Sequence, residues 1–240
     1  MRFTGKTETG LRPQNEDTYM LLRTEAFDAV AVADGMGGHR AGEVASRTAV
    51  EAAERVLSSG GDNWESLLFE AFKAANEAVR VLASSDDSMY GMGCTLVAAA
   101  FDETTFIAAN VGDSRLYCFD GETLKQVTHD HSFVAELVRR GAITPEEAKT
   151  HPRRNLITRA IGAEMRVSVD VFSCEWKKGD MLLLCSDGLC GVLSDEEMAE
   201  HLRGCEDLDA ACSELIAHAL TCGSRDNITV VLVKNDGGDA

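Results

Sequence analysis

Ala29-Val-Ala-Val-Ala-Asp34 is apolar up to its last residue, which is an aspartate. The pattern recurs in Ile107-Ala-Ala-Asn-Val-Gly-Asp113 and in Met181-Leu-Leu-Leu-Cys-Ser-Asp187. A strand without alternating polar residues is covered on both faces, so these strands belong inside a layered fold. We therefore predict that each strand carries its aspartate to the rim of a buried sheet.

A fourth aspartate, Asp226, comes just before the apolar stretch Ile228–Val233. In an antiparallel sheet the start of one strand lies beside the end of its neighbour, so Asp226 can join Asp34 and Asp187 at one rim. Taken singly, each acid beside a glycine is more simply explained as a turn residue. Three buried strands that all lead to carboxylates, without a basic partner nearby in sequence, favour a common site instead.

The other patterns predict an α+β fold, because strands and helices come in blocks rather than in regular alternation. Helical spacing of apolar residues and two capping boxes predict four helices. The boxes are Asp62 with Glu65 and Ser194 with Glu197, and the helices are expected over 40–58, over 64–82, after Ser194 and over 208–219. Strands are predicted at 18–23, 28–33, 95–101, 105–111, 115–119, 123–127, 167–174, 180–186 and 227–234. No linker or repeat interrupts the chain, so residues 1–240 are predicted to form a single domain.

Charge and composition exclude several classes of function. The chain has 23 Lys and Arg against 40 Asp and Glu, a formal net charge of −17. This excess repels nucleic acid and anionic membranes, and a phosphate-handling enzyme would need metal ions or local arginines. The eight cysteines show no CxxC pair and no Cys/His cluster at zinc spacing, and no apolar stretch has the length of a signal peptide or membrane span. We expect a cytoplasmic protein with no nucleic-acid or membrane partner.

The acids also predict a metal site. Clustered carboxylates repel one another unless a cation compensates them, and oxygen ligands without His or Cys favour Mg²⁺ or Mn²⁺. Arg12, close to Glu16 and Asp17, offers a guanidinium suited to phosphate. The glycines after the first aspartate let the backbone approach an ion, so the Gly35 carbonyl is a candidate ligand. His39 is either a general acid or a histidine without a chemical role.

Competing hydrolase chemistries lack their motifs. The sequence contains no Cys-x5-Arg, no GxxxxGK[ST] and no HExxH. Cysteine-dependent phosphatases, P-loop NTPases and the simplest zinc peptidases are therefore excluded.

Seven motifs follow one another over nearly the whole chain. They are Arg12-Pro-Gln-Asn-Glu-Asp17, Asp34-Gly-Met-Gly-Gly-His39 with Ala41-Gly-Glu-Val-Ala-Ser46, Gly93-Cys-Thr95, Asn110-Val-Gly-Asp-Ser-Arg115, Leu156-Ile-Thr-Arg-Ala-Ile-Gly162, Ser186-Asp-Gly188 and Arg225-Asp-Asn-Ile-Thr-Val230. Together they resemble the bacterial form of the metal-dependent protein serine/threonine phosphatases, the type 2C family. The resemblance implies an α-β-β-α layered sandwich, with two central antiparallel sheets flanked by helices.

The resemblance further implies a centre of two Mn²⁺ or Mg²⁺ ions at one end of the sandwich. By motif position Asp34 would bridge the ions and the Gly35 carbonyl would bind the second one. The expected remaining roles are Asp187 and Asp226 on the first ion, Glu16 and Asp17 acting through water, Arg12 on the substrate phosphate, and Asp113 with Asp187 at a third, looser metal site. Met36 stands where animal members carry a histidine, which leaves His39 as the candidate general acid.

The implied reaction is hydrolysis of phosphoserine and phosphothreonine in proteins. Two ions about 3.5–4 Å apart can orient a bridging hydroxide for in-line attack on phosphorus, without a covalent intermediate. The expected partners are a Ser/Thr kinase and its substrates, and the chain is expected to be monomeric. Two alternatives are a regulatory phosphatase that serves one dedicated partner and a non-catalytic phosphoprotein-binding module; the full set of carboxylates argues against the second.

Residues 129–160, the flap, differ in charge from the rest of the chain. They hold six basic and four acidic residues in a protein that is strongly acidic overall. The segment corresponds to the mobile flap of the family. We predict that it helps to receive an anionic phosphoprotein segment through Arg153 and Arg154, although a solvated helix-turn-helix with scattered charge explains the composition equally well.

Overall fold

The computed structural model describes residues 1–37, 41–61 and 63–237. The strands are β1 (Arg2–Glu8), β2 (Asp17–Arg23), β3 (Asp28–Met36), β4 (Gly93–Cys94), β5 (Leu96–Phe101), β6 (Thr105–Val111), β7 (Arg115–Phe119), β8 (Leu124–Gln126), β9 (Asp170–Glu175), β10 (Met181–Cys185) and β11 (Ile228–Lys234). The helices are α1 (Ala41–Leu57), α2 (Trp64–Ser85), the 3-10 turn η1 (Asp87–Met89), α3 (Phe133–Arg139), α4 (Pro145–Thr150), α5 (Asp187–Cys190), α6 (Asp195–Leu202) and α7 (Leu208–Thr221).

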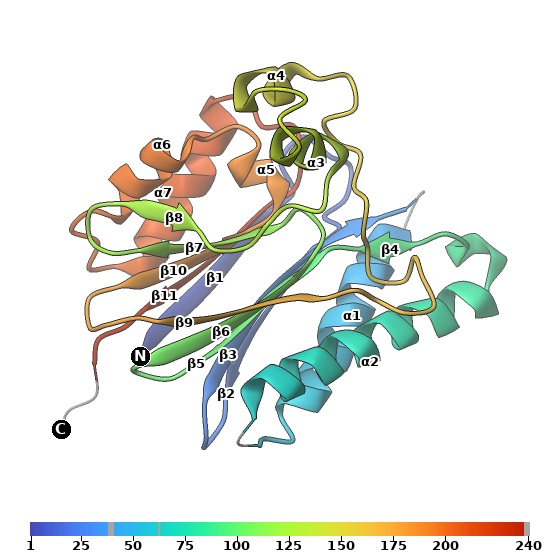
Figure 1. Ribbon diagram of the computed structural model, residues 1–240, viewed down its shortest axis with the longest axis horizontal. Coiled ribbons are helices and arrows are strands. Elements are labelled where there is room, and N and C mark those ends of the chain that lie inside the picture. The colour runs from blue at the N-terminus through green and yellow to red at the C-terminus, as the bar shows by residue number, and fades with distance from the viewer. Residues whose placement is uncertain (38–40, 62, 238–240) are drawn as a thin grey trace.

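Two antiparallel sheets form the middle layers of the molecule (Figure 1). The first has the strand order β1-β11-β10-β7-β8, and the second has the order β2-β3-β5-β6-β9 with β4 paired to β3. Helices α6 and α7 cover the outer face of the first sheet, and α1 and α2 cover the second. The predicted α-β-β-α sandwich is confirmed.

The alternation of alanine and valine in β3 follows from its two neighbours. Ala29, Ala31 and Ala33 belong to the apolar cluster shared with α1 and α2, while Val30 and Val32 belong to the cluster between the two sheets. Side chains alternate across a strand, so the small residues let the helix pack closely and the valines fill the space between the sheets. The strand is buried on both faces, as its apolar sequence predicts.

Some local predictions need correction. Strand β1 is not evident from the sequence, because its residues are mostly half-buried and polar; it pairs with β11 at the edge of the first sheet. Helix α2 is capped by Asn63, whose side chain accepts from the Ser66 N–H at 2.9 Å, instead of by the predicted Asp62–Glu65 box. Asp62 lies outside the described residues. The box of Ser194 and Glu197 is present at the start of α6.

The flap contains the two short helices α3 and α4. Among its described side chains only His131, Ser132 and Val134 are buried. The backbone closes on itself, since the Phe133 N–H donates to Leu156 O at 2.8 Å and the Thr158 N–H to His131 O at 2.7 Å. None of the helices in the described ranges has the length and apolarity needed to cross a membrane.

Candidate metal centre

Five aspartates from separate segments meet at one end of the sandwich, and we call them the carboxylate centre. Asp17 opens β2 directly opposite Asp34 on β3. The acids do not share the rim of one sheet, as the sequence suggested: Asp34 lies in the second sheet, whereas Asp187 and Asp226 stand where β10 ends and β11 begins in the first. The fifth acid, Asp113, follows β6. The two sheets therefore present their acids to each other across the end of the sandwich.

Asp34 is affected by the charges of all four other acids in this group. Burial raises its pKa well above the usual range, and the charges of Asp17, Asp187, Asp113 and Asp226 raise it further. Like charges in a low-dielectric site disfavour ionisation unless cations are present. The clustered carboxylates therefore strongly favour the binding of cations.

Asp17 is held rigidly through one carboxylate oxygen. The hydroxyls of Ser186 and Thr229 each donate to Asp17 Oδ2 at 2.7 Å. Its Oδ1 is buried and has no hydrogen-bond partner among the described residues. Burial raises the pKa of Asp17 to about 7, against the effect of the two hydroxyls and with the help of the Asp187 and Asp226 charges. One oxygen is thus anchored while the other is left for a ligand.

Asp187 is positioned where β10 turns into α5. The turn is tight, because a Cβ on Gly188 would lie 1.9 Å from the carbonyl oxygen of Asn227. Asp187 Oδ1 is also buried without a partner in the part of the chain that the structure describes. Burial, followed by the charge of Asp226, raises the pKa of Asp187. An unpartnered buried oxygen of this kind is a ready cation ligand.

Arg12 is exposed and donates to Asp226 Oδ2 at 2.7 Å. This hydrogen bond to Asp226 raises the pKa of the guanidinium. The side chain thus lies at the open edge of the carboxylate centre, where the sequence analysis places a phosphate ligand.

Gly35 lies at a close crossing of three backbone segments. Its N–H donates to Glu16 O at 3.1 Å, and a Cβ in its place would stand 2.1 Å from Gly42 O. The neighbouring Asp34 is fixed by Thr95, which exchanges two hydrogen bonds with its backbone at 2.8 and 2.9 Å. Glu16 is half-buried with its carboxylate against Gly42, and burial raises its pKa. Only glycine fits at position 35.

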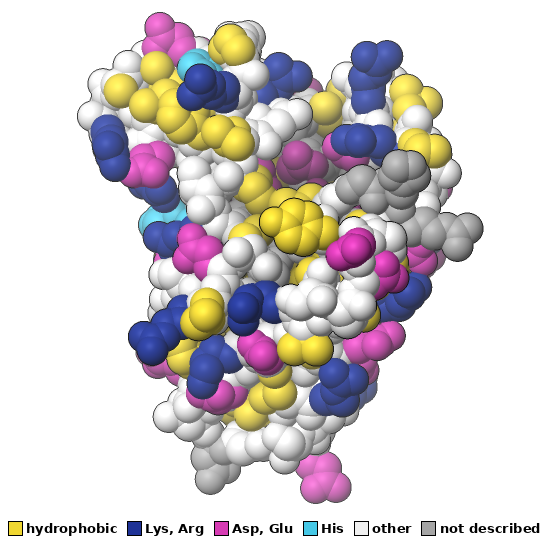
Figure 2. Space-filling model, turned by 90° about the vertical axis from the view of Figure 1, so that its right-hand side faces the viewer, with side chains coloured by type: hydrophobic (Ala, Val, Ile, Leu, Met, Phe, Trp, Pro, Cys, Tyr) yellow, Lys and Arg dark blue, Asp and Glu magenta, His cyan; other side chains and the backbone are white. Residues whose placement is uncertain are grey.

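Asp113 lies beside a cavity of about 940 Å³ between the flap, α5 and α6. Burial, and then the charge of Asp187, raises its pKa to about 7. The cavity is lined by Asp113, Asp187 and Arg154 among others. Figure 2 shows that this end of the molecule is hollowed in its upper half, with acidic side chains in the depth of the hollow.

The two arginines predicted on the flap differ in position. Arg154 lines the cavity that Asp113 and Asp187 share, whereas Arg153 does not line it and stacks over the ring of Phe133 at 5.5 Å. His39 lies outside the described residues, so its role stays a prediction.

Sequence reasoning missed several polar side chains that hold the acids. Besides Ser186, Thr229 and Thr95, Asn227 accepts from the Glu16 N–H at 2.8 Å and donates to Thr9 O and Gln14 O. Ser186, Asn227 and Thr229 stand in motifs that also carry an acid, such as Arg225-Asp-Asn-Ile-Thr-Val230, whereas Thr95 stands in the motif Gly93-Cys-Thr95. Polar residues at the ends of buried strands, and Thr229 inside β11, were the available signal, since a buried polar group needs a partner.

The donor set fits hard divalent cations. The converging groups are carboxylates, two of them with a buried oxygen left free, together with a backbone segment that glycine alone can form. Oxygen donors of this kind suit Mg²⁺ and Mn²⁺ better than softer metals.

The chain is similar to known proteins over almost its whole length. The sequence model of the family described as "Protein phosphatase 2C" matches residues 6–228. A relative named "Serine/threonine phosphatase stp", from Listeria monocytogenes, is 40% identical over an alignment of 242 positions, which covers 96% of this chain and 94% of the relative. The crystal structure of the serine/threonine phosphatase Stp1 from Staphylococcus aureus superimposes with a TM-score of 0.92 at 36% identity, covering 98% of this chain and 95% of that one. A structure of the catalytic domain of the phosphatase PstP with two manganese ions has a TM-score of 0.86 at 36% identity, with 97% of each chain covered.

Proposed function

This chain belongs to the protein phosphatase 2C family and is a serine/threonine protein phosphatase of that type, and from this we propose that the carboxylate centre is its active site, working with two Mn²⁺ or Mg²⁺ ions. The observation that carries the proposal is the meeting of five aspartates at one point, where burial and the charges of the other four raise the pKa of Asp34. The relative solved with two manganese ions supports the choice of metal.

Each acid has a proposed task. Asp34, at the middle of the group, would bridge the two ions, with the Gly35 carbonyl on one ion and Asp187 and Asp226 on the other. Asp17 is fixed through Oδ2 and would use its free Oδ1 toward bound water, as would Glu16. Asp113 would join Asp187 at a third, looser site.

Bound divalent ions supply the Lewis acidity that activates a water and neutralises phosphate charge. Arg12 orients the substrate: its guanidinium now pairs with Asp226 and can turn to two phosphate oxygens when Asp226 binds a cation instead. The Cys94 thiol next to Asp34 does not serve as a nucleophile, because burial raises its pKa. We propose that hydrolysis proceeds by attack of a metal-activated water, without a covalent intermediate. The general acid is proposed to be His39.

The test compares an aryl phosphate with a phosphothreonine peptide as substrates. We expect both to be hydrolysed with Mn²⁺, and neither with EDTA or by the variants Asp34→Asn and Asp226→Asn. An exposed acid outside the carboxylate centre, Glu70, which pairs with Lys73 on α2, provides the control Glu70→Gln, which should keep full activity. Activity that survives EDTA would refute the metal-dependent mechanism.

The physiological setting is also a proposal. We propose that the chain is a monomer in the cytoplasm and reverses the action of a Ser/Thr kinase on its substrates. The alternative is a phosphatase dedicated to one regulatory partner. Metal-dependent hydrolysis of the aryl phosphate without cleavage of any phosphopeptide would favour that alternative.

A further inference from the structure

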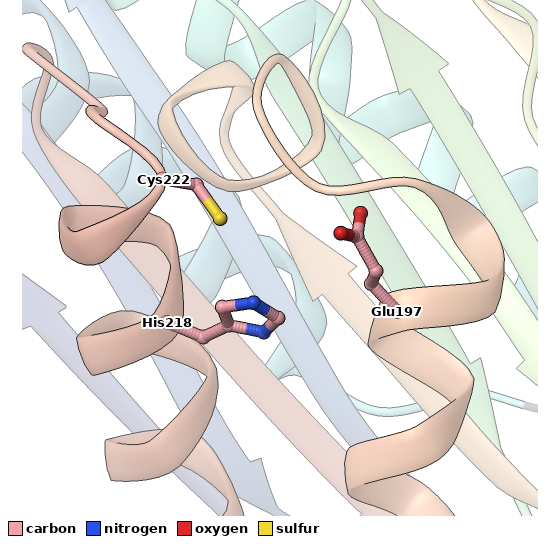
Figure 3. Close-up of side chains that lie close together, drawn as sticks. All are labelled: Glu197, His218 and Cys222. Atoms are coloured by element: carbon pink, nitrogen blue, oxygen red, sulfur yellow. The ribbon is translucent and has the colours of Figure 1, made fainter.

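A second group of metal-ligating side chains lies outside the carboxylate centre, between α6 and α7. Glu197, His218 and Cys222 each offer one ligand atom, and these atoms lie within 4.8 Å of one another (Figure 3). Glu197 and His218 are half-buried and Cys222 is exposed, so the group is open to solvent on one side.

The spacing on each helix brings these side chains to one seam. His218 and Cys222 are four residues apart at the end of α7, where the Cys222 N–H donates to His218 O at 2.8 Å. Glu197 and His201 have the same spacing on α6. Residues four apart share a helix face, so each helix directs two such side chains toward the other.

The ligand atoms are oriented by neighbouring contacts. Glu197 Oε2 accepts from the Ser194 N–H at 2.8 Å and from its hydroxyl at 2.7 Å, which leaves Oε1 free to bind. His218 Nδ1 lies 3.0 Å from His201 Nε2, which leaves His218 Nε2. Figure 3 shows one ring nitrogen of His218 directed toward the space between the Glu197 carboxylate and the Cys222 sulfur.

The second nitrogen of His201 continues this contact chain. His201 Nδ1 lies 3.6 Å from the carboxylate of Glu214. A histidine that binds metal usually shares its other ring nitrogen with an orienting partner of this kind. Glu214 and His201 thus fix the tautomer and direction of His218.

We propose that Glu197, His218 and Cys222 bind one Zn²⁺ ion, with water as the fourth ligand. A carboxylate, an imidazole and a thiolate form a borderline-soft donor set, unlike the oxygen-only carboxylate centre. The thiolate and the carboxylate together balance the charge of the ion. Tetrahedral zinc bonds of 2.0–2.3 Å place ligand atoms roughly 3.3–3.7 Å apart. The side chains must therefore close by about 1 Å, which the exposed Cys222 can supply by rotation.

Zinc at this position would join α6 to α7. The start of α6, including Ser194 and Glu197, also lines the cavity that reaches Asp113 and Asp187. The ion would therefore fix one wall of the cavity beside the active site. The competing explanation is a capping glutamate, a histidine pair and a surface thiol that bind nothing.

Cobalt reports on the site directly, because Co²⁺ gives a thiolate charge-transfer band only when a cysteine binds it. The full chain is stripped of metal, kept reduced with a phosphine, and titrated with Co²⁺ and then with Zn²⁺. We expect a band whose final intensity corresponds to one thiolate-bound Co²⁺ per chain and that is displaced by Zn²⁺. Cys222→Ser should abolish the band and weaken Zn²⁺ binding at this site by about 100-fold or more. Cys205→Ser, which changes a thiol in the α6–α7 connection, is the matched control and should leave both unchanged.

Two variants distinguish metal binding at this site from metal binding at the carboxylate centre. In Asp34→Asn the cobalt band should persist although phosphatase activity is lost, and in Cys222→Ser activity with Mn²⁺ should persist although the band is lost. Glu197→Gln keeps a residue suited to the capping box and should weaken Zn²⁺ binding without unfolding α6. The proposal is wrong if the wild-type chain shows no thiolate band, or if the band remains in Cys222→Ser.

Discussion

The carboxylate centre and the flap lie on either side of the same cavity, and they are built in opposite ways. The acids of the centre stand at the ends of strands that are buried on both faces, and buried hydroxyls and backbone groups hold them. The flap buries few side chains and is held mainly by polar contacts at its base. There Arg115 forms a two-pronged contact with Asp130, and His131 Nε2 lies 3.1 Å from Asp170. We infer that the core of the fold fixes the carboxylate centre. The flap, by contrast, can change its conformation without disturbing the core.

The largest difference between changes in the carboxylate centre and changes in the flap is expected from Asp34→Asn. This substitution removes the proposed bridging carboxylate, and kcat should fall by at least about 1,000-fold. It also removes a carboxyl group whose ionised form is disfavoured by burial and by four neighbouring acids in the metal-free protein, so the melting temperature in EDTA should rise. Melting curves and Mn²⁺-dependent rates of the same variant distinguish loss of metal binding from loss of stability. A lower melting temperature in EDTA together with the loss of activity would contradict this explanation.

Glycine substitutions test how differently the two regions tolerate added atoms. Gly35→Ala places a Cβ 2.1 Å from a backbone oxygen, so the strands must shift; a loss of about 3 kcal/mol in unfolding free energy and a large loss of activity are expected. Gly141→Ala in the flap meets no atom within 4 Å and has only its positive φ of 67° against it, a cost of about 1 kcal/mol. Urea unfolding of both variants measures the difference. Equal losses would mean that the flap is packed as tightly as the centre.

The pH dependence of the metal-free protein sharpens the comparison. Folding raises the pKa of Asp17 and Asp113 to about 7 from the usual aspartate value of 3.8, mainly through burial. The folded state therefore binds protons that the unfolded state releases, and this stabilisation is complete below about pH 4 and is lost as the pH rises through about 7. In EDTA the melting temperature should therefore fall over this range.

Saturating Mn²⁺ should reverse this trend, because ionised acids bind the metal and protonated acids do not. Asp34→Asn in EDTA should show a flatter profile, since one source of repulsion is gone. A melting temperature in EDTA that rises from pH 5 to pH 7 would contradict the proposed origin of the effect.

The same contrast explains what the sequence could predict. Strand ends fix backbone position, so the apolar stretches before Asp34 and Asp187 were enough to predict that the acids converge. Which sheet each strand joins depends on contacts between distant segments, and the placement of all these acids on one rim was therefore wrong. The edge strand β1 and the hydroxyl partners of Asp17 depend on such contacts too, because a half-buried polar strand has no distinctive period.

For the flap, the sequence predicts the charge of the segment but not the positions of its side chains. Its composition predicts a basic surface but does not say which arginine faces the cavity. That choice depends on whether a guanidinium stacks on Phe133 or turns inward, and the energy difference between such contacts is small. Arg153 and Arg154 are adjacent in sequence, yet only Arg154 lines the cavity shared with Asp113.

The smallest expected effect follows from this difference. Arg154→Gln should raise KM for a phosphothreonine peptide by about 3- to 10-fold, because an exposed arginine contributes roughly 1 kcal/mol to binding an anionic segment. KM for an aryl phosphate, which has no flanking residues to contact the flap, should change less than 2-fold. Arg153→Gln is the matched neighbour and should have a smaller effect on the peptide, since its guanidinium is engaged with Phe133. Equal increases for both substrates would place Arg154 among the groups that bind the phosphate itself, and would remove the distinction between a fixed centre that performs the reaction and a flap that selects the substrate.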